Sequence, residues 1–254
     1  MDLAKEIARF PNTGRFLAGR LRHDMSEAEK EELERLVEQT STAGDGDRIV
    51  ERGEQCDRST LLIEGFVVRT IENDGRRYAV SFHVPGDFVD LHCFALKRLD
   101  HNLDCIGPAR FGHVSHAAIL DIMQRRPHLA RLLWFQTLLD AAMHREWIMK
   151  LEQLTAPRRI AHVFAEIWRR LEMVGLGYAD GFDTPLRQTD IAQMCGTTAI
   201  HANRALAELR SKGIADFQRG EVRIRDRDKL EDYADFSADY LYGDGALALR
   251  TIAA

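Results

Sequence analysis

The sequence lacks any long apolar run. No stretch of its 254 residues approaches the roughly 18 uninterrupted apolar residues that a membrane-spanning helix requires. The first ten residues carry charges at Asp2, Lys5, Glu6 and Arg9, so they contain no apolar segment of the kind found in secretory signals. These absences predict a cytoplasmic protein that does not enter a membrane.

Cysteine is scarce and dispersed. The four cysteines, Cys56, Cys93, Cys105 and Cys195, form no CxxC pair and no run typical of an iron–sulfur cluster, which favours buried or incidental thiols. The sequence also has no phosphate-binding P-loop, no nucleophile elbow and no His-x-His pair. We therefore expect neither an enzyme nor a metal site, and His113-x-x-His116 is interpreted as a strand-to-helix junction.

Charge is unevenly distributed along the chain. The formal net charge is −5, which argues against a nucleic-acid partner, but basic residues outnumber acidic ones between Pro157 and Arg225. The segment Asp226–Asp244 that follows is an acidic tail. A local basic face can bind phosphates even when the whole chain is acidic.

The predicted secondary structure of the N-terminal half changes from helix to strand near residue 44. Residues 1–40 are predicted to be helical, with Ser26 and Glu29 at the spacing of a capping box. Short strands and turns are predicted from Arg48 to about Ala118, including a hairpin turn at Asn73-Asp74-Gly75. This pattern is typical of a small β-sandwich or barrel, and we expect a jelly roll.

Apolar residues then recur at helical spacing. After Pro127 a helix is predicted to continue to Leu154, with a broad stripe of large side chains. The stripe consists of Leu129, Leu132, Leu133, Leu138, Leu139, Ala142, Met143, Trp147, Leu151 and Leu154. It is broader than one domain needs, so we expect a parallel dimer through this helix; the alternative is a single long core helix.

The segment Pro185–Gly213 predicts a helix-turn-helix. The first helix is expected over Gln188–Met194, and Gly196 supplies a turn that favours positive φ. The second helix is expected over Thr198–Ser211, with Gly213 as its C-cap. Its inward face would be formed by Ala202, Ala205, Leu206 and Leu209. A short hairpin around Gln218-Arg219-Gly220 follows in the position of a wing.

Polar side chains on this motif are candidate DNA contacts. Arg204 can donate two hydrogen bonds to a guanine, and Asn203 can pair with an adenine. The predicted DNA-binding residues are Gln188, Thr189, Thr198, Ala199, His201, Asn203, Arg204 and Arg219. The alternative is an amphipathic helical hairpin without a ligand, in which Arg204 pairs with Glu208 at i,i+4 spacing.

The whole arrangement resembles the Crp/Fnr family of bacterial transcription regulators over about residues 25 to 240. The resemblance rests on Glu64-Gly65, Asp74-Gly75 and Pro85-Gly86-Asp87-Phe88, and on Gln188–Gly196 and His201-Ala-Asn-Arg204 in the helix-turn-helix. It implies an α+β protein with three parts. These are N-terminal helices and a cyclic-nucleotide-binding-like jelly roll (1–125), a long dimerisation helix (126–154) and a C-terminal winged helix-turn-helix with the acidic tail (155–254).

Departures from the family pattern concern the effector. Members that bind cyclic AMP follow Gly-Asp-Phe with a Gly-Glu pair and a later Arg that holds the phosphate. Here these positions read Val89-Asp90-Leu91-His92 and His101-Asn102, so the resemblance implies an altered effector pocket at Asp90, Leu91, His92, His101 and Asn102. An acid there would repel the anion, which argues against cyclic AMP.

The sequence also differs from the oxygen-sensing relatives, and its recognition helix departs from the family pattern. The oxygen-sensing branch uses an N-terminal cysteine cluster that is absent here, whereas haem-binding relatives use His and Cys nearby, so His92, Cys93 and Cys105 stay open as alternative ligands although no cofactor is predicted. Ala199-Ile200 replaces an Arg-Glu pair, so the operator should differ from that of the cyclic-AMP receptor.

The sequence therefore predicts a sequence-specific, DNA-binding transcription regulator. It would act as a cytoplasmic homodimer on a palindromic operator, with RNA polymerase as a further partner if it activates. The alternative is a sensory binding module for haem, a metal or a small metabolite, with weak or lost DNA binding.

Overall fold

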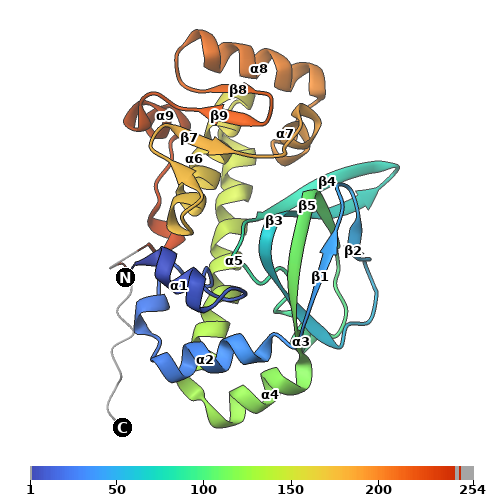
Figure 1. Cartoon of the computed structure of the whole chain (residues 1–254). Helices are drawn as coiled ribbons and strands as arrows, with labels where there is room; N and C mark the ends of the chain where they lie inside the picture. Colours follow the sequence, from blue (N-terminus) through green and yellow to red (C-terminus); the bar gives the residue numbers. More distant parts are fainter. Residues whose placement is uncertain (1, 244–245, 247–254) are drawn as a thin grey trace.

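The computed structural model describes residues 2–243 and 246. A curled β-sheet and a winged helical part are connected by the long helix α5 (Pro127–Gln153), which runs along both of them (Figure 1). The jelly-roll and winged-helix architecture predicted from the sequence is confirmed. A helix that could span a bilayer is absent from the described residues.

The N-terminal segment is only partly helical. Its helices are α1 (Leu3–Arg9), the 3-10 turn η1 (Arg22–Asp24) and α2 (Glu27–Leu36). The capping box is confirmed, because Ser26 Oγ accepts from the Glu29 N–H and the Glu29 carboxylate accepts from the Ser26 N–H. The expectation of helix throughout residues 1–40 was wrong for 37–40, where α2 has ended and β1 begins, and for 10–21. Pro11 removes a donor there, and the Glu34 carboxylate holds Asn12 and Thr13 in turns.

The sheet is antiparallel. Its strands are β1 (Gln39–Ala43), β2 (Arg48–Val50), β3 (Arg58–Asn73), β4 (Arg76–His83) and β5 (Asn102–Ser115). Their order is β1-β5-β3-β4, with β2 also paired to β5. The hairpin between β3 and β4 turns at Asp74 and Gly75, as predicted.

The strands are longer than expected. The register between β3 and β5 shifts around Glu64, and each strand continues through the irregularity. A bulge bends a strand without ending it, so segments that the sequence suggested were separate belong to one curved strand. The short helix α3 (Cys93–Leu96) follows, and a small apolar core closes inside the curl. That core contains Leu62, Val67, Val89, Cys93, Leu99, Leu103, Cys105, Ala109 and Phe111.

Helix α4 (His116–Arg125) begins directly after β5, so His113 and His116 do lie at a strand-to-helix junction. Pro127 is in the first turn of α5, which packs one face into the main core through Leu132, Leu139 and Trp147. The other face exposes Trp134, Leu138 and Ile148, whose exposed fractions are 64%, 51% and 68%. Of the ten residues of the predicted apolar stripe, eight are buried within the described part of the chain, and Leu138 and Leu151 are exposed. The expectation that the stripe is too broad for one domain to cover was therefore wrong for most of its residues, and Trp134 and Ile148 were not part of it.

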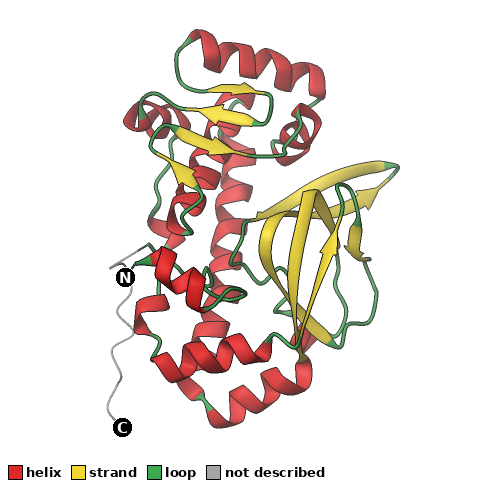
Figure 2. Ribbon diagram, in the orientation of Figure 1, coloured by secondary structure: helices red, strands yellow, loops and turns green. Residues whose placement is uncertain are grey.

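The C-terminal part holds helices around a small antiparallel sheet (Figure 2). Its elements are α6 (Ala156–Met173), β6 (Gly177–Tyr178), β7 (Gly181–Asp183), α7 (Gln188–Met194), α8 (Ala199–Ser211), β8 (Asp216–Gln218), β9 (Glu221–Arg223), α9 (Arg227–Ala234) and η2 (Asp239–Leu241).

Two of these segments were not predicted in this form. The glycine-rich link after α6 is a short hairpin whose strand β7 pairs with β9 and so joins the sheet of the wing. The acidic segment that begins at Asp226 is folded, because Leu230, Phe236 and Leu241 are buried in the main core. Asp244, the last residue of that predicted tail, lies outside the described residues.

Candidate nucleic-acid interface

A tight turn sets the angle between α7 and α8. The first helix has the predicted bounds Gln188–Met194, and the second begins at Ala199 with Thr198 as its N-cap. Gly196 adopts φ +58, a conformation that an L side chain rarely takes. A Cβ there would also lie 3.0 Å from Leu151 Cδ2 of α5. The turn therefore requires glycine both for its backbone and for its contact with the long helix.

The inward side of α8 is packed as predicted. Ala202, Ala205, Leu206 and Leu209 are all buried. The small side chains of Ala202 and Ala205 let the helix approach its neighbours closely. At the start of the helix, Thr198 Oγ1 accepts a hydrogen bond from the backbone N–H of His201 at 3.3 Å. The helix is thus fixed in orientation before any ligand binds.

The outward side of α7 and α8 carries the predicted contacts. Every one of the residues proposed from the sequence is exposed: Gln188, Thr189, Thr198, Ala199, His201, Asn203, Arg204 and Arg219. The Asn203 amide donates to the side-chain carbonyl of Gln188 at 3.1 Å, which connects the two helices at the surface. Gln188 and Asn203 therefore adjoin at the surface of the two helices, whereas Arg219 lies on the wing.

The alternative interpretation requires an ion pair between Arg204 and Glu208, and the structure does not contain this pair. The Glu208 carboxylate accepts instead from Lys212 at 2.7 Å and from the Tyr233 hydroxyl at 3.0 Å. Lys212 holds the pKa of Glu208 below its usual range. Arg204 has no hydrogen bond or ion pair within residues 2–243 and 246. Its guanidinium is therefore available to a ligand.

The wing extends from the same surface. Strands β8 and β9 pair in register, and their turn holds Arg219 at φ +53. Phe217 packs against Phe164 of α6, with ring centroids 6.0 Å apart, which anchors the wing to the domain. Arg223 is already paired with Asp180 and Glu221, so Arg219 is the better candidate for a backbone contact.

One arginine that sequence reasoning missed joins this domain to α5. The Arg159 guanidinium donates to the carbonyls of Leu151 at 2.6 Å, Leu154 at 2.8 Å and Cys195 at 3.2 Å. The first two are at the end of α5 and the third is at the end of α7. Arg159 was counted only among the basic residues, whereas the structure uses it to cap two helices.

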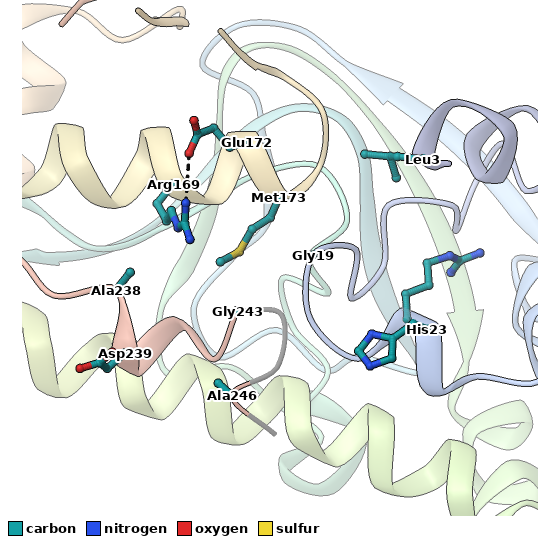
Figure 3. A pocket seen from close by; sticks show the side chains of 11 residues that line it. Leu3, Gly19, His23, Arg169, Glu172, Met173, Ala238, Asp239, Gly243 and Ala246 are labelled. Atoms are coloured by element: carbon teal, nitrogen blue, oxygen red, sulfur yellow. Dashed lines mark ion pairs between the residues drawn. The ribbon is translucent and has the colours of Figure 1, made fainter. Parts of the chain in front are cut away.

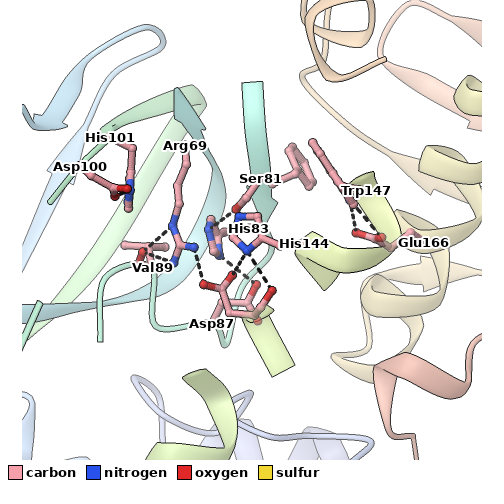
Figure 4. Close-up of polar contacts among 12 residues, drawn as sticks. Arg69, Ser81, His83, Asp87, Val89, Asp100, His101, His144, Trp147 and Glu166 are labelled. Carbon is pink, nitrogen blue, oxygen red and sulfur yellow. Dashed lines mark hydrogen bonds and ion pairs between the residues drawn. The ribbon is translucent and has the colours of Figure 1, made fainter. Parts of the chain in front are cut away.

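A buried polar network joins the sheet domain to α6, and Figure 4 shows its contact between Trp147 and Glu166. Arg170 donates to the Asp87 carboxylate at 2.6 Å and to Glu166 at 3.3 Å, and Glu166 accepts from the Trp147 indole at 3.1 Å. His83 lies beside Asp87 at 3.6 Å. Burial, together with the charge of Arg69, lowers the pKa of His83 to about 4, so its imidazole is neutral.

Most of the predicted effector positions are buried in the sheet domain. Asp90, His101 and Asn102 are buried, and the rings of His92 and His101 lie 5.5 Å apart. Burial raises the pKa of Asp90 to about 7 even though its carboxylate accepts from the Thr60 N–H. Leu91 is buried beside them in the main apolar core.

Arg69 is the arginine that extends into this region. Its guanidinium donates twice to the Val89 carbonyl, at 3.1 and 2.6 Å, and also pairs with Asp140 of α5 (Figure 4). The charge of Arg69 holds the pKa of Asp140 at about 2, against the opposing effect of burial. An anionic effector would therefore have to displace these partners.

Two of the alternative haem or metal ligands lie in apolar surroundings. Cys93 and Cys105 belong to the apolar core inside the sheet. Burial raises the pKa of both thiols, that of Cys105 to about 11, which disfavours the thiolate needed for metal binding. Within the described part of the chain, no three His, Cys, Asp or Glu side chains are arranged to hold a metal ion.

A separate hollow of about 850 Å³ lies between the N-terminal segment, the end of α6 and the chain around Gly243 (Figure 3). Its volume would suit a small metabolite. Its arginines are already paired, however: Arg169 with Glu172 at 3.6 Å, and Arg22 with Glu6 at 2.8 Å. It therefore does not resemble a preformed anion site.

Comparison with known proteins agrees with this geometry. Residues 158–233 match the Crp-like helix-turn-helix domain. The transcriptional activator protein FnrL of Cereibacter sphaeroides is 28% identical over 176 residues, which is 66% of this chain and 69% of FnrL. The nitrogen fixation regulation protein FixK of Bradyrhizobium diazoefficiens is 26% identical over 158 residues, covering 62% of this chain and 65% of FixK.

Solved structures share the fold. The structure of FixK2 from Bradyrhizobium japonicum superposes with a TM-score of 0.71 at 23% identity, covering 79% of this chain and 98% of that one. A CRP-family transcriptional regulator from Thermus thermophilus gives a TM-score of 0.62 at 20% identity, covering 78% and 97%. The likeness therefore extends over the sheet domain as well as the matched helix-turn-helix.

Proposed function

The chain belongs to the Crp/Fnr family of transcription regulators, and on that premise we propose that it is a homodimer that reads a palindromic operator through α8. The family is composed of regulators with a DNA-binding helix-turn-helix, not of enzymes. The protein would act on DNA in the cytoplasm, and would contact RNA polymerase where it activates transcription.

The observation that carries the proposal is the unpaired Arg204 on a fully packed recognition helix. An unpaired guanidinium on the exposed face can meet O6 and N7 of a guanine in the major groove. The Glu208 carboxylate, which could have neutralised it, is bound to Lys212 and Tyr233. Asn203 and His201 are exposed on either side of Arg204 and would read neighbouring bases.

The exposed side of α5 supports the proposed dimer. Trp134, Leu138 and Ile148 present large apolar surfaces that residues 2–243 and 246 leave exposed. Their spacing puts them along one side of the helix, so a second copy could cover them in a parallel helix pair. Two-fold symmetry would then separate the recognition helices by about 34–36 Å, one turn of DNA.

We further propose that the effector pocket is altered and does not take cyclic AMP. Asp90, Leu91, His101 and Asn102 are buried where a phosphate clamp would be expected, and Arg69 is bound to Val89 and Asp140. Arg69 is therefore occupied, and the positions assigned to the pocket (Asp90, Leu91, His92, His101 and Asn102) include no lysine or arginine that could bind a phosphate in its place.

Selection of bound sequences from a random DNA pool tests the proposal directly. We expect a palindrome with half-sites one helical turn apart, bound more weakly as salt rises because phosphate contacts release counterions. A protein that selects no sequence and does not bind mixed DNA at low salt would contradict the proposal. That outcome would favour the alternative, a sensory module that has lost DNA binding.

A further inference from the structure

A polar contact holds α7 against the sheet domain. The Arg187 guanidinium, at the N-cap of α7, pairs with the Asp45 carboxylate from the turn between β1 and β2. The other carboxylate oxygen of Asp45 accepts from the backbone N–H of Gly107 in β5 at 2.9 Å. Asp45 is therefore held in position by the sheet while it binds an arginine of the helix-turn-helix.

Two further contacts support this arrangement. Arg77 of β4 donates to the Asp104 carboxylate at 3.1 Å and to the Gln193 side chain of α7 at 2.8 Å. Gly107 has φ +72, and a Cβ on it would lie 2.8 Å from Pro185 Cβ, just before α7. Side chains and backbone thus bring this edge of the sheet against the start of the helix-turn-helix, as Figure 1 also shows for α7 and β4.

The ion pair between Arg187 and Asp45 is exposed to solvent and is easily broken. The side chains of Arg187 and Asp45 are 69% and 42% exposed, and a hollow of about 310 Å³ bordered by Arg48, Asp104 and Asp190 lies beside them. An exposed ion pair next to open space contributes little to stability and is weakened by salt. The Arg170–Asp87 contact of α6, which is 1% and 6% exposed, is of the opposite kind.

The position of Arg187 suggests what replaces Asp45. It directly precedes Gln188, whose side chain is hydrogen-bonded to Asn203 of the recognition helix. A duplex bound on this surface would bring its phosphates close to the same guanidinium. Guanidinium groups bind carboxylates and phosphates through the same paired N–H donors, so the two acceptors compete.

We propose that Arg187 is a DNA-backbone ligand and that Asp45 occupies it in the free protein, forming an interdomain latch that must open when DNA binds. The inference rests on the proposed function, because it needs DNA as the competing ligand. Asp45 mimics a phosphate, and Arg77–Gln193 restores the docked position after release. Signals that move the sheet domain away from α7 would thereby raise the affinity for DNA.

The test compares isosteric variants that remove one charge. Asp45→Asn keeps an acceptor for Gly107 but weakens the ion pair, Arg187→Gln removes the cation, and the double variant closes a thermodynamic cycle. Asp57→Asn is the matched control, because Asp57 is an acidic residue of the sheet domain that pairs with Arg58. Affinity for the selected duplex and a scrambled duplex is measured by fluorescence anisotropy at several salt concentrations.

Asp45→Asn is expected to tighten binding of both duplexes by about two- to fivefold, the range for an exposed ion pair. Asp57→Asn should leave binding unchanged. Arg187→Gln should weaken both duplexes alike and make the salt dependence shallower by about one unit per protomer. Asp45→Asn should have no further effect in the Arg187→Gln background.

A second readout tests the latch without DNA. Amide exchange over residues 187–194 should be faster in Asp45→Asn than in the wild type and in Asp57→Asn, because the helix is less firmly docked. Equal exchange and equal affinity in the two asparagine variants would overturn the latch, as would an Asp45→Asn effect that persists without Arg187. Failure of the wild type and all variants to bind DNA would instead contradict the proposed function, and the latch with it.

Discussion

The Arg170 guanidinium donates to the Asp87 carboxylate across 2.6 Å, and both side chains are almost completely buried. Arg170 belongs to α6, and Asp87 follows β4 of the sheet domain. Burial alone would raise the pKa of Asp87, but the charge of Arg170 outweighs it and holds the pKa well below its usual range. The two domains are therefore joined by an ion pair that water does not reach.

Removing one partner of this pair should destabilise the whole chain. Arg170→Met would leave the Asp87 carboxylate buried without its counter-charge and lower the free energy of unfolding by about 3–5 kcal/mol. Because the folded pKa of Asp87 is depressed, the stabilisation is present above its unfolded pKa of about 3.9 and is lost at lower pH. Urea denaturation followed by circular dichroism measures both effects.

Arg169→Met, on the exposed side of α6, is the control and should change stability by less than about 1 kcal/mol. Equal losses of stability in the variants at 169 and 170 would contradict the assignment.

His162 should make the protein sensitive to mild acid. Burial, and then the charge of Lys150, lowers its pKa from 6.5 to about 4. The folded state binds fewer protons than the unfolded chain between these values, so stability falls as pH decreases from 6.5 to 4. The slope for this group approaches about 1.4 kcal/mol per pH unit. His162→Phe keeps the aromatic contact with Phe236 and should flatten the dependence of the unfolding free energy on pH. His23→Gln, at an exposed histidine, should not, and an unchanged slope in His162→Phe would disprove the effect.

Alanine substitutions at Arg204 and at Arg219 should change DNA binding in different ways. Arg204→Ala is expected to lose about 1–3 kcal/mol on the selected site and to flatten preference at one base pair in each half-site. Arg219→Ala should weaken all duplexes alike and reduce the salt slope by about one unit per protomer. Titrations of both variants against specific and scrambled duplexes separate the two results. An unchanged ratio of specific to scrambled affinity in Arg204→Ala would mean that α8 does not read the sequence.

The exposed apolar side of α5 predicts where the dimer forms. Ile148→Glu should place a charge in the middle of the proposed helix pair and convert dimer to monomer at micromolar concentration, with unchanged secondary structure. Light scattering coupled to size exclusion gives the mass directly. Asp57→Lys, a charge change at an exposed position of the sheet domain and not on α5, is a comparison that should keep the dimer. A wild-type monomer, with or without DNA, would refute the proposal.

Cyclic AMP should not bind with micromolar affinity. The carboxyl of Asp90 is buried at the expected phosphate position, and Arg69 is bound to Asp140. Asp140→Asn frees Arg69 from its counter-charge and should be the variant most able to gain weak binding. Calorimetry with the wild type and this variant is the measurement, and heat of binding from the wild type at micromolar ligand would contradict the altered pocket.

Local signals in the sequence were sufficient for much of the fold. Ser26 and Glu29, Asp74-Gly75 and Gly196 each act on their immediate neighbours, so their spacing alone predicted a cap, a hairpin and a turn. The inward and outward sides of α8 followed from helical periodicity in the same way. The contacts with DNA and the division at residues 125/126 and 154/155 stay predictions.

Contacts between distant segments could not be predicted in this way. Arg170 and Asp87 are 83 positions apart, and Arg187 and Asp45 are 142 apart. A charged side chain gives no sign in the sequence of whether it will be buried beside a partner or solvated. The turns at residues 10–21 were missed for a related reason, since Glu34 stabilises them from the next helix.

The tryptophans are distributed so that each lies in a different electrostatic setting. Trp134 is 64% exposed on α5, Trp147 donates to Glu166 with the Lys150 ammonium 3.8 Å from its ring centroid, and Trp168 has the Arg227 guanidinium at 4.2 Å. An indole beside a buried charge emits differently from one in water, and its emission changes when that charge moves. Substituting two tryptophans at a time would leave one optical probe each for the proposed dimer face, for the junction of α5 with α6, and for the winged domain, without any attached dye.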